Sequence, residues 1–205
     1  MKRIFYFIAA ISLFSCGSKD KPTEKKLIVD SKAQFLNDHA VVLATTHREK
    51  DSILKAIKML HKATEIQPDY FIAFSNKMAF QNQVGLRDEA FKTLQKMISL
   101  SPENPDLYMA EGYYYDEKGE TENAIEKYQK AEELYISLLK KLEKGTENYD
   151  MNRMNRALNL KLLGENEKSN KVLDEIIQDT SNEIIKEEAM KYKKMTKEDI
   201  IKMEN

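Results

Sequence analysis

Apolar residues recur at intervals of three and four along most of the chain, from about Ile28 onward. This spacing places them on one face of an α-helix, and no alternating run rich in valine, isoleucine and threonine indicates a strand. The pattern predicts helices over residues 31–47, 52–66, 70–84, 87–100, 105–118, 121–144, 150–163, 166–179 and about 182–195. The first eight pair into four hairpins, and the last helix is expected to cap the apolar face of the fourth hairpin.

Two polar residues stand where predicted first helices begin. Asp69 and Asn104 are of the type whose side chains accept hydrogen bonds from the free N–H groups of a first helical turn. Pro105 follows Asn104 at the first helical position, which proline favours because no N–H is needed there.

The same kinds of residue also recur every 34 residues. Ala56, Ala90 and Ala124 are spaced by this interval, and so are Gly85 and Gly119. Further columns share it: Leu60, Leu94 and Tyr128; Ala63, Met97 and Ala131; Ile66, Leu100 and Leu134; Pro68 and Pro102. A fixed interval of this length indicates stacked copies of one helical hairpin, each covering the apolar face of its neighbour.

One segment carries this repeat most completely. It resembles the tetratricopeptide repeat family between Pro105 and Ala131, at the positions of Tyr108, Gly112, Tyr115, Gly119, Ala124 and Tyr128. Two helices approach closely only where small residues such as Gly112 and Ala124 remove bulk, and tyrosines fill the space beside them. The resemblance implies an all-α fold, a right-handed superhelix of such hairpins with three clear repeats, a degenerate fourth and a C-terminal capping helix.

The fourth hairpin departs from the repeat. Gly164 aligns with Gly119, yet the aligned positions then hold Arg153, Ser169 and Ser181. The two glycines are 45 rather than 34 residues apart, which predicts that the second helix of the third hairpin is longer by about three turns.

The added length carries an apolar stripe of Tyr135, Leu138, Leu139 and Leu142. Packing of this stripe on the helix over 150–163 is the favoured interpretation. A protruding partner site is the alternative.

The chain begins with Lys2 and Arg3, followed by an apolar run over residues 4–14. Because eleven residues at about 1.5 Å each do not span a hydrocarbon core of about 30 Å, the run indicates a secretion signal. The stretch that ends at Cys16, Leu13-Phe14-Ser15-Cys16, resembles the lipobox cleaved by signal peptidase II. The resemblance implies a lipid anchor on Cys16 that holds the protein on a membrane. An ordinary signal with a chance cysteine is the alternative.

This interpretation divides the chain into a lipoprotein signal peptide (1–15), an acylated cysteine with a flexible tether (16–27) and a helical repeat domain (28–205). It places the protein in the bacterial cell envelope, attached to the membrane through Cys16. Gly17 follows the cysteine where some bacteria have an aspartate that resembles an inner-membrane retention signal. The outer membrane is therefore the favoured location.

Charge and composition argue against several classes of function. The 33 basic and 34 acidic residues are well mixed, so no patch indicates a nucleic-acid partner. Cys16 is the only cysteine, and the three histidines, His39, His47 and His61, form no His-Glu-x-x-His motif. No glycine-rich phosphate loop or nucleophile elbow is present either. We expect no metal, no cofactor and no enzymatic activity.

Hairpins of the tetratricopeptide type curl so that their first helices line a concave groove. Carried over position by position, the resemblance implies these partner-binding residues: Arg48, Ile72, Asn82, Gln83, Met109, Tyr113, Asp116 and Glu117. The centre of the set is apolar and one edge is acidic, which suits a positively charged peptide or helix. Of the run Tyr113-Tyr114-Tyr115 only Tyr113 is expected in the groove, because successive helical residues point about 100° apart.

These features predict a non-catalytic, lipid-anchored scaffold or adaptor that binds other envelope proteins or peptides. Two other functions stay open. A periplasmic receptor for a small ligand or glycan would be stabilised by that ligand, and a hydrolase would lose turnover when an acidic groove residue is changed.

Overall fold

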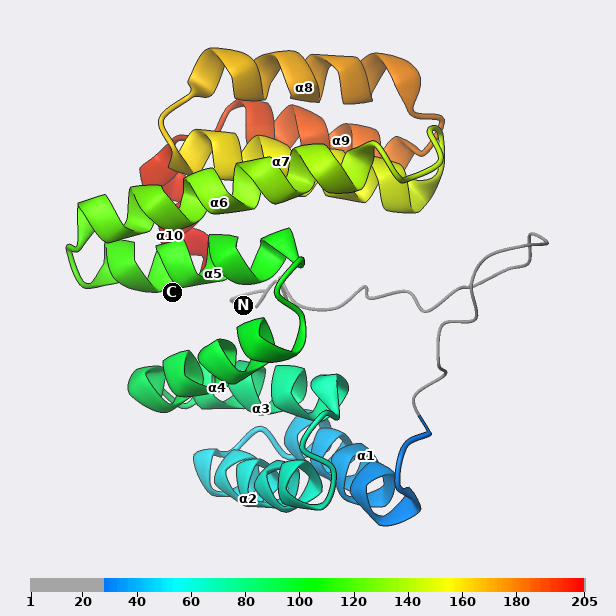
Figure 1. Ribbon diagram of the computed structural model, residues 1–205, viewed down its shortest axis with the longest axis vertical. Helices are drawn as coiled ribbons and strands as arrows, with labels where there is room; N and C mark the ends of the chain where they lie inside the picture. The colour runs from blue at the N-terminus through cyan, green and yellow to red at the C-terminus, as the bar shows by residue number, and fades with distance from the viewer. Residues whose placement is uncertain (1–27, 205) are drawn as a thin grey trace. The chain divides into compact units, whose positions relative to one another are not determined.

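The computed structural model describes residues 28–204, which form ten α-helices and no β-strand (Figure 1). The helices are α1 (Ser31–Thr46), α2 (Lys50–Ile66), α3 (Phe71–Gln83), α4 (Arg87–Leu100), α5 (Pro105–Glu117), α6 (Thr121–Leu139), α7 (Glu147–Leu162), α8 (Asn166–Asp179), α9 (Glu183–Lys193) and α10 (Lys197–Glu204). The predicted all-α fold of paired helices is confirmed, with most helix ends within about three residues of their predicted positions.

The described chain divides into two compact units, residues 28–100 with α1 to α4 and residues 101–204 with α5 to α10. In the N-terminal unit α1 packs on α2, α2 on α3 and α3 on α4. In the C-terminal unit each helix from α5 to α8 packs on the next one, and α10 packs on α7. Each unit is therefore a stack of helical hairpins with its own core.

Three of the columns that recur every 34 positions form these cores. Their members on the second helices α2, α4 and α6 are at most 1% exposed: Ala56, Leu60, Ala63, Ala90, Leu94, Met97, Ala124, Tyr128 and Ala131. The column of Ile66, Leu100 and Leu134 lies nearer the surface, and Ile66 is 38% exposed. In the three buried columns, alanines let neighbouring helices approach and larger residues fill the remaining space.

One type of turn closes three of the hairpins. Gly85, Gly119 and Gly164 have φ between +74° and +81°, a left-handed conformation that glycine adopts without strain. After the last of them, the N–H of Glu165 donates to the carbonyl oxygen of Leu160 at 2.8 Å, as in a Schellman motif. The same bond recurs after the other two glycines. The fourth hairpin is therefore a true copy of the unit, aligned through Gly164.

In the fourth hairpin, Ser169 stands at the repeat position that Ala124 holds in the third, and its contacts explain this difference. Ser169 is fully buried in α8, and its hydroxyl donates to the carbonyl oxygen of Ala157 in α7 at 2.7 Å. The side chain is still small enough for close helix contact, and its polar atom has a partner.

The prediction that the second helix of the third hairpin reaches residue 144 was wrong. Helix α6 ends at Leu139, a loop over residues 140–146 follows, and α7 begins at Glu147 rather than at 150. Gly145 has φ +78°, and the Thr146 side chain accepts a hydrogen bond from the N–H of Tyr149 at 3.2 Å. Because of these two residues, α7 begins before its predicted start. The residues by which the interval from Gly119 to Gly164 exceeds 34 are therefore divided among α6, the loop and α7.

Helix α6 packs on α7. Of the predicted apolar stripe, Tyr135 is completely buried and its hydroxyl contacts Asp106 of α5, whereas Leu138 and Leu139 are half-buried and Leu142 lies in the loop. Packing of the whole stripe on α7 stays a prediction. Three residues before Tyr135, the Glu132 carboxylate accepts from the guanidinium of Arg156 in α7, with Nη2 donating to Oε1 at 2.6 Å and Nε donating to Oε2 at 3.1 Å. Such a two-pronged pair fixes the relative position of the two helices.

The ends of several helices test the caps that the sequence predicts. Asn104 caps α5 by accepting from the N–H of Asp106 at 3.0 Å, as predicted. The cap predicted at Asp69 was wrong, because α3 begins after Tyr70 and has no side-chain cap. Helix α9 packs on α8 where a capping helix was expected, and α10 follows it unpredicted.

The signal peptide (1–15), the anchor at Cys16 and the tether (16–27) lie outside the described residues and stay predictions. Within residues 28–204, no helix combines the length and apolar character needed to cross a membrane.

Candidate partner-binding surface

The groove residues predicted in the N-terminal unit lie on three separate parts of it. Arg48 is exposed in the link between α1 and α2. Ile72 is 42% exposed in the first turn of α3. Asn82 and Gln83 are half-buried at the other end of α3, where Asn82 Oδ1 accepts from Arg87 Nη1 at 2.9 Å. Only Ile72 presents a large apolar surface to solvent among these four.

Helix α1 has small residues at the centre of its packed face, with Leu36, Val41 and Leu43 partly buried beside them, and two large apolar residues on its exposed face. The face that packs on its neighbours holds Ala33, Ala40 and Ala44. The opposite face exposes 57% of Phe35 and 63% of Val42, two helical turns apart. Between them the His39 ring lies 4.0 Å from the Phe35 ring, centroid to centroid. We call Phe35, His39 and Val42 the α1 stripe. The reverse arrangement is usual for a helix that serves only the core.

The groove residues predicted in the C-terminal unit all lie on α5, and most are covered. Met109 and Tyr113 are buried, with 5% and 8% exposed. The Asp116 side chain is also 8% exposed, and only Glu117 at the end of the helix is open. The helical spacing correctly places Tyr113 and Asp116 on one face.

The segment that covers this face is α10. The Tyr113 hydroxyl donates to the carbonyl oxygen of Ile201 at 2.9 Å. Lys197 Nζ lies 2.7 Å from Asp116 Oδ2 and 5.5 Å from the centre of the Tyr128 ring. The α10 helix also packs on α7 (Figure 1). The surface predicted to bind a helix thus already holds one.

Tyr128 connects this surface to the core. Its hydroxyl donates to Asp116 Oδ2 at 2.8 Å. Burial and the nearby Asp116 carboxylate raise the pKa of Tyr128 well above its usual range, so the hydroxyl keeps its proton and remains a donor. Asp116 is therefore held between one neutral donor and one ammonium group.

A second buried carboxylate joins three helices of the same unit. Asp106 in α5 accepts hydrogen bonds from the hydroxyl of Tyr135 in α6 and from Asn155 Nδ2 in α7, the latter at 3.2 Å. The Tyr135 hydroxyl also lies 3.9 Å from the sulfur of Met109. Burial raises the pKa of the Asp106 carboxyl in spite of these hydrogen bonds.

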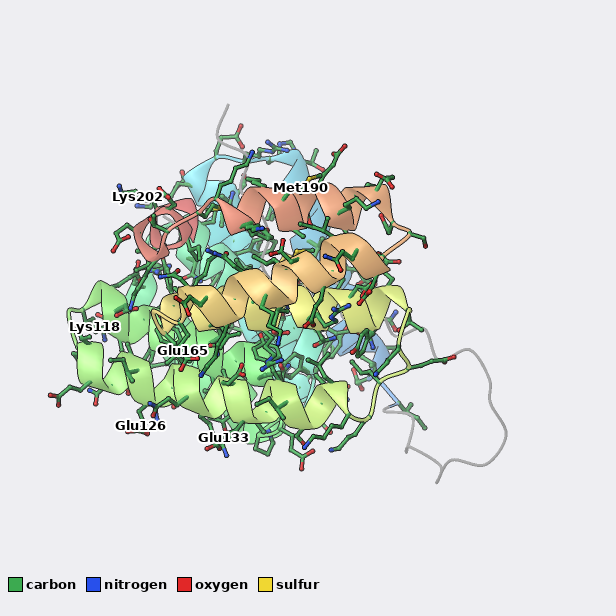
Figure 2. All side chains as sticks on the ribbon, turned by 90° about the horizontal axis from the view of Figure 1, so that it is seen from above. Lys118, Glu126, Glu133, Glu165, Met190 and Lys202 are labelled. Atoms are coloured by element: carbon green, nitrogen blue, oxygen red, sulfur yellow. The ribbon has the colours of Figure 1, made fainter. Side chains whose placement is uncertain are left out.

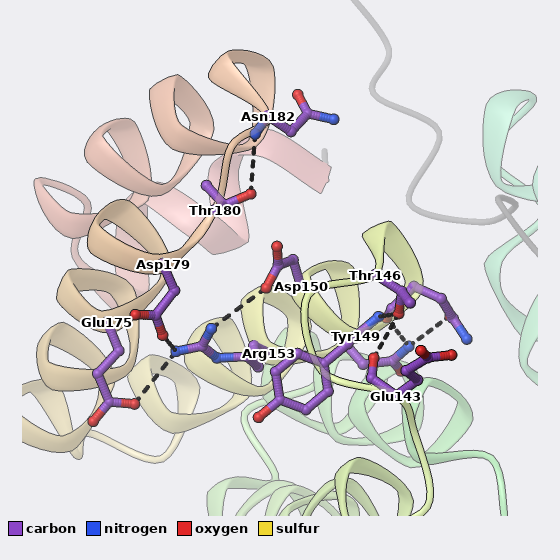
Figure 3. Close-up of polar contacts among 11 residues, drawn as sticks. Glu143, Thr146, Tyr149, Asp150, Arg153, Glu175, Asp179, Thr180 and Asn182 are labelled. Carbon is purple, nitrogen blue, oxygen red and sulfur yellow. Dashed lines mark hydrogen bonds and ion pairs between the residues drawn. The ribbon is translucent and has the colours of Figure 1, made fainter.

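A cluster of charges links α7 and α8 (Figure 3). The guanidinium of Arg153 is buried and lies 3.2 Å from Asp179, 3.4 Å from Glu175 and 3.4 Å from Asp150. It also lies 5.4 Å from the centre of the Tyr149 ring. Arg153 departs from the repeat because it serves this cluster, whose groups satisfy one another and leave the arginine little exposed.

A shallow hollow of about 230 Å³ lies between α3 and α4 in the N-terminal unit. Its lining includes the three lysines Lys77, Lys92 and Lys96 together with Glu89, and Phe74 forms part of its wall. Burial lowers the pKa of the Lys77 ammonium. On α3, Phe74 and Lys77 point away from the direction of Ile72, so the hollow is separate from the predicted groove.

Much of the remaining surface is charged. Glu126 and Glu133 project from the outer side of α6, and Glu165 lies at the turn before α8 (Figure 2). Among the described residues, no group of three or more histidine, cysteine, aspartate or glutamate side chains is arranged to hold a metal ion.

Two features escaped the sequence analysis. The α1 stripe was detectable from helical spacing, because Ala33, Ala40 and Ala44 fall on one face of the predicted helix and Phe35 and Val42 fall on the opposite face. Helix α10 was detectable from Thr196 and Asp199, a capping box before Ile200 and Ile201. In the structure the Thr196 hydroxyl accepts from the N–H of Asp199 at 3.2 Å, and the Asp199 carboxylate accepts from the N–H of Thr196 at 3.0 Å.

One hairpin of this chain also matches a known protein family by sequence. Residues 105–135, which comprise α5 and most of α6, match the family model of the tetratricopeptide repeat. A search of curated proteins found no match. The third hairpin thus matches the tetratricopeptide repeat by sequence, and the described residues form an all-α fold of helical hairpins.

Two solved structures are also similar. The chain resembles YrrB, described as a TPR protein with an unusual peptide-binding site, at 17% identity and a TM-score of 0.45, over 70% of this chain and 66% of that one. It resembles the MamA protein at 17% identity and a TM-score of 0.43, over 78% of this chain and 88% of that one. The match to YrrB spans slightly less than two thirds of that protein.

Proposed function

We propose that this protein is a non-catalytic scaffold of the bacterial cell envelope, attached to the membrane by lipid on Cys16, that binds other envelope proteins or peptides. The observation that carries the proposal is the α1 stripe. Phe35 and Val42 are large apolar side chains held on a well-packed helix with more than half of their surface in solvent. Apolar groups that do not serve the core mark surfaces that bind other proteins.

The rigid support of this stripe favours a binding role. Asn76 Nδ2 in α3 donates to Asn37 Oδ1 in α1 at 2.9 Å, and Asp30 caps α1 through the N–H groups of Lys32 and Ala33. The helix is therefore fixed at its start and at its middle. A surface ordered before binding loses less conformational entropy when a partner arrives.

The anchor is supported by the sequence Leu13-Phe14-Ser15-Cys16. Metabolic labelling with a palmitate analogue should label the wild type and not a Cys16→Ser variant. The variant should also leave the membrane fraction. Equal labelling of both proteins, or an unlabelled wild type, would remove the anchor from the proposal and leave the α1 stripe untouched.

The partner is tested by cross-linking in cells followed by affinity recovery of the acylated protein. A defined protein should be recovered with the wild type and lost with a Phe35→Ser/Val42→Ser variant. A Lys58→Ser/Lys62→Ser variant, changed at exposed positions of α2, is the matched control and should keep it. Recovery that is the same in all three proteins would contradict the assignment of the surface.

A periplasmic receptor for a small ligand is the second candidate. The hollow between α3 and α4 is lined by Lys77, Lys92 and Lys96 against the single acidic residue Glu89, and this excess of positive charge favours an anionic ligand. Phosphate and simple carboxylates are the probes. A rise in melting temperature that disappears in a Lys92→Ala/Lys96→Ala variant would support the receptor, whereas the scaffold predicts no such rise.

A further inference from the structure

We propose that the C-terminal unit has a second interaction site, which binds a short helix of a protein partner that carries a lysine in its first turn. Tyr113, Asp116 and Tyr128 form this α10 site, and α10 occupies it until the partner displaces α10. The inference rests on the proposed scaffold function and specifies the chemistry of one of its partners.

The α10 helix is held at its start and near its middle. At its start, Lys197 forms an ion pair with Asp116 at 2.7 Å and faces the Tyr128 ring. Near its middle, the carbonyl oxygen of Ile201 accepts from the Tyr113 hydroxyl at 2.9 Å. That carbonyl is among the last four of the helix, which have no partner within it. The side chain between these contacts, Ile200, is 5% exposed.

Lys197 is placed for the site rather than for its own helix. The N-terminal end of a helix carries partial positive charge, so a lysine there is unfavourable while acidic residues such as Glu198 and Asp199 are favourable. Asp116 provides the opposite charge that the helix lacks. Because Asp116 is largely buried and Tyr128 stays neutral, the ammonium group of the bound helix is the compensating cation.

The same contacts make α10 displaceable. A helix of eight residues is not stable alone in water, and α10 depends on its capping box and on the site. Short terminal elements with few buried side chains open at a low free-energy cost. A partner helix with a lysine, followed three residues later by an aliphatic side chain, satisfies the same groups. It competes with α10, which benefits from being tethered nearby.

The test uses the full chain and a fluorescein-labelled peptide that copies residues 195–205. A Lys197→Glu/Ile200→Asp variant opens the site, and it should bind the peptide at least tenfold more tightly than the wild type does. Adding Asp116→Asn to the open variant should reduce binding at least tenfold, because the charge is lost while an acceptor for Tyr128 remains. A peptide with glutamate in place of its lysine should not bind.

A milder variant guards against loss of structure. Lys197→Ala removes the α10 side chain whose ammonium group pairs with Asp116 and leaves the site itself unchanged, so it should increase peptide binding over the wild type with an unchanged circular dichroism spectrum. If neither the open variant nor Lys197→Ala binds the peptide better than the wild type, the inference is overturned. Concentration-dependent dimers of the wild type would also overturn it, since the occupant would then be a second copy.

The two proposals fail separately. The α1 stripe is tested in the N-terminal unit through Phe35 and Val42, and the α10 site in the C-terminal unit through purified protein and peptide. Peptide binding without a cellular partner would leave the α10 site standing and remove the scaffold function. A partner that depends on Phe35 and Val42 without peptide binding would do the reverse.

Discussion

The ring of Tyr128 lies directly against the backbone of Gly112, so closely that a Cβ atom at Gly112 would be 2.5 Å from Cε1 of that ring. No side chain fits in this space. The contact joins α5 and α6 at the centre of the third hairpin, and Tyr128 is completely buried there. The glycine and the tyrosine of the repeat are therefore one structural feature and not two.

A Gly112→Ala change should destabilise the C-terminal unit by about 1–3 kcal/mol, although alanine normally stabilises a helix by about 1 kcal/mol over glycine. Overlap with the Tyr128 ring is the cause. Urea unfolding followed by tyrosine fluorescence measures the effect, since eight of the ten tyrosines follow Ser101.

A double-mutant cycle separates overlap from other effects of this substitution. In a Tyr128→Leu background the cost of Gly112→Ala should fall by more than half. In a Tyr128→Phe background, which keeps the ring, the cost should persist. An unchanged cost in the leucine background would show that the ring is not the cause.

The Arg153 cluster should respond asymmetrically to mutation. Removing the guanidinium in Arg153→Met leaves the Asp150 carboxylate buried without its cation, a change that typically costs about 3–5 kcal/mol. Replacing Asp150 as well, in Arg153→Met/Asp150→Leu, should recover at least half of the lost stability.

Neutral replacements at Glu175 and Asp179, which are half exposed or more, should cost less than about 1 kcal/mol each. Equal losses at all three carboxylates would contradict the view that burial of Asp150 decides the outcome.

Asp106 should make the stability depend on pH. Its folded-state pKa is raised by burial above the unfolded value of about 3.9, so folding favours the protonated form. This contribution is fully present below the unfolded pKa and is lost as the pH rises through the folded pKa. An Asp106→Asn variant, which keeps an acceptor for Tyr135, should therefore be at least as stable as the wild type at pH 7.

Urea unfolding at several pH values between 7 and 4 measures the stability of both proteins. The difference between Asp106→Asn and the wild type should shrink as the pH falls and the wild-type carboxyl is protonated. Asp106→Ala, which removes the acceptor of a buried hydroxyl, should be less stable than both. A difference that grows towards pH 4 would mean that the carboxylate form is the favoured one.

The repeat in the sequence predicts most of this fold because it reports burial. A column such as Ala56, Ala90 and Ala124 records a contact that each hairpin makes in the same way, so helix order and core positions follow. The end of α6 was missed because Gly145 and the Thr146 cap interrupt a run of residues that would otherwise continue a helix. Local turn chemistry decided there, and the repeat contained no information about it.

The binding surface was less predictable for a different reason. Helical spacing correctly placed Tyr113 on the same face as Asp116, yet it does not tell which distant segment covers that face. Helix α10 lies outside the 34-residue repeat, and its capping box is the sequence signal that predicts it. The α1 stripe was missed because the groove positions were taken from the family pattern. Large apolar residues that lie on the helix face opposite the core were not considered.

The most direct measurement is cross-linking from a photoreactive amino acid placed at Val42 in living cells, with Lys58 as the control position. The account predicts a discrete cross-linked protein from Val42 that is absent from Lys58 and is lost when Phe35 is changed to serine. No product from Val42, or the same products from both positions, would contradict the claim that the outer face of α1 binds a partner.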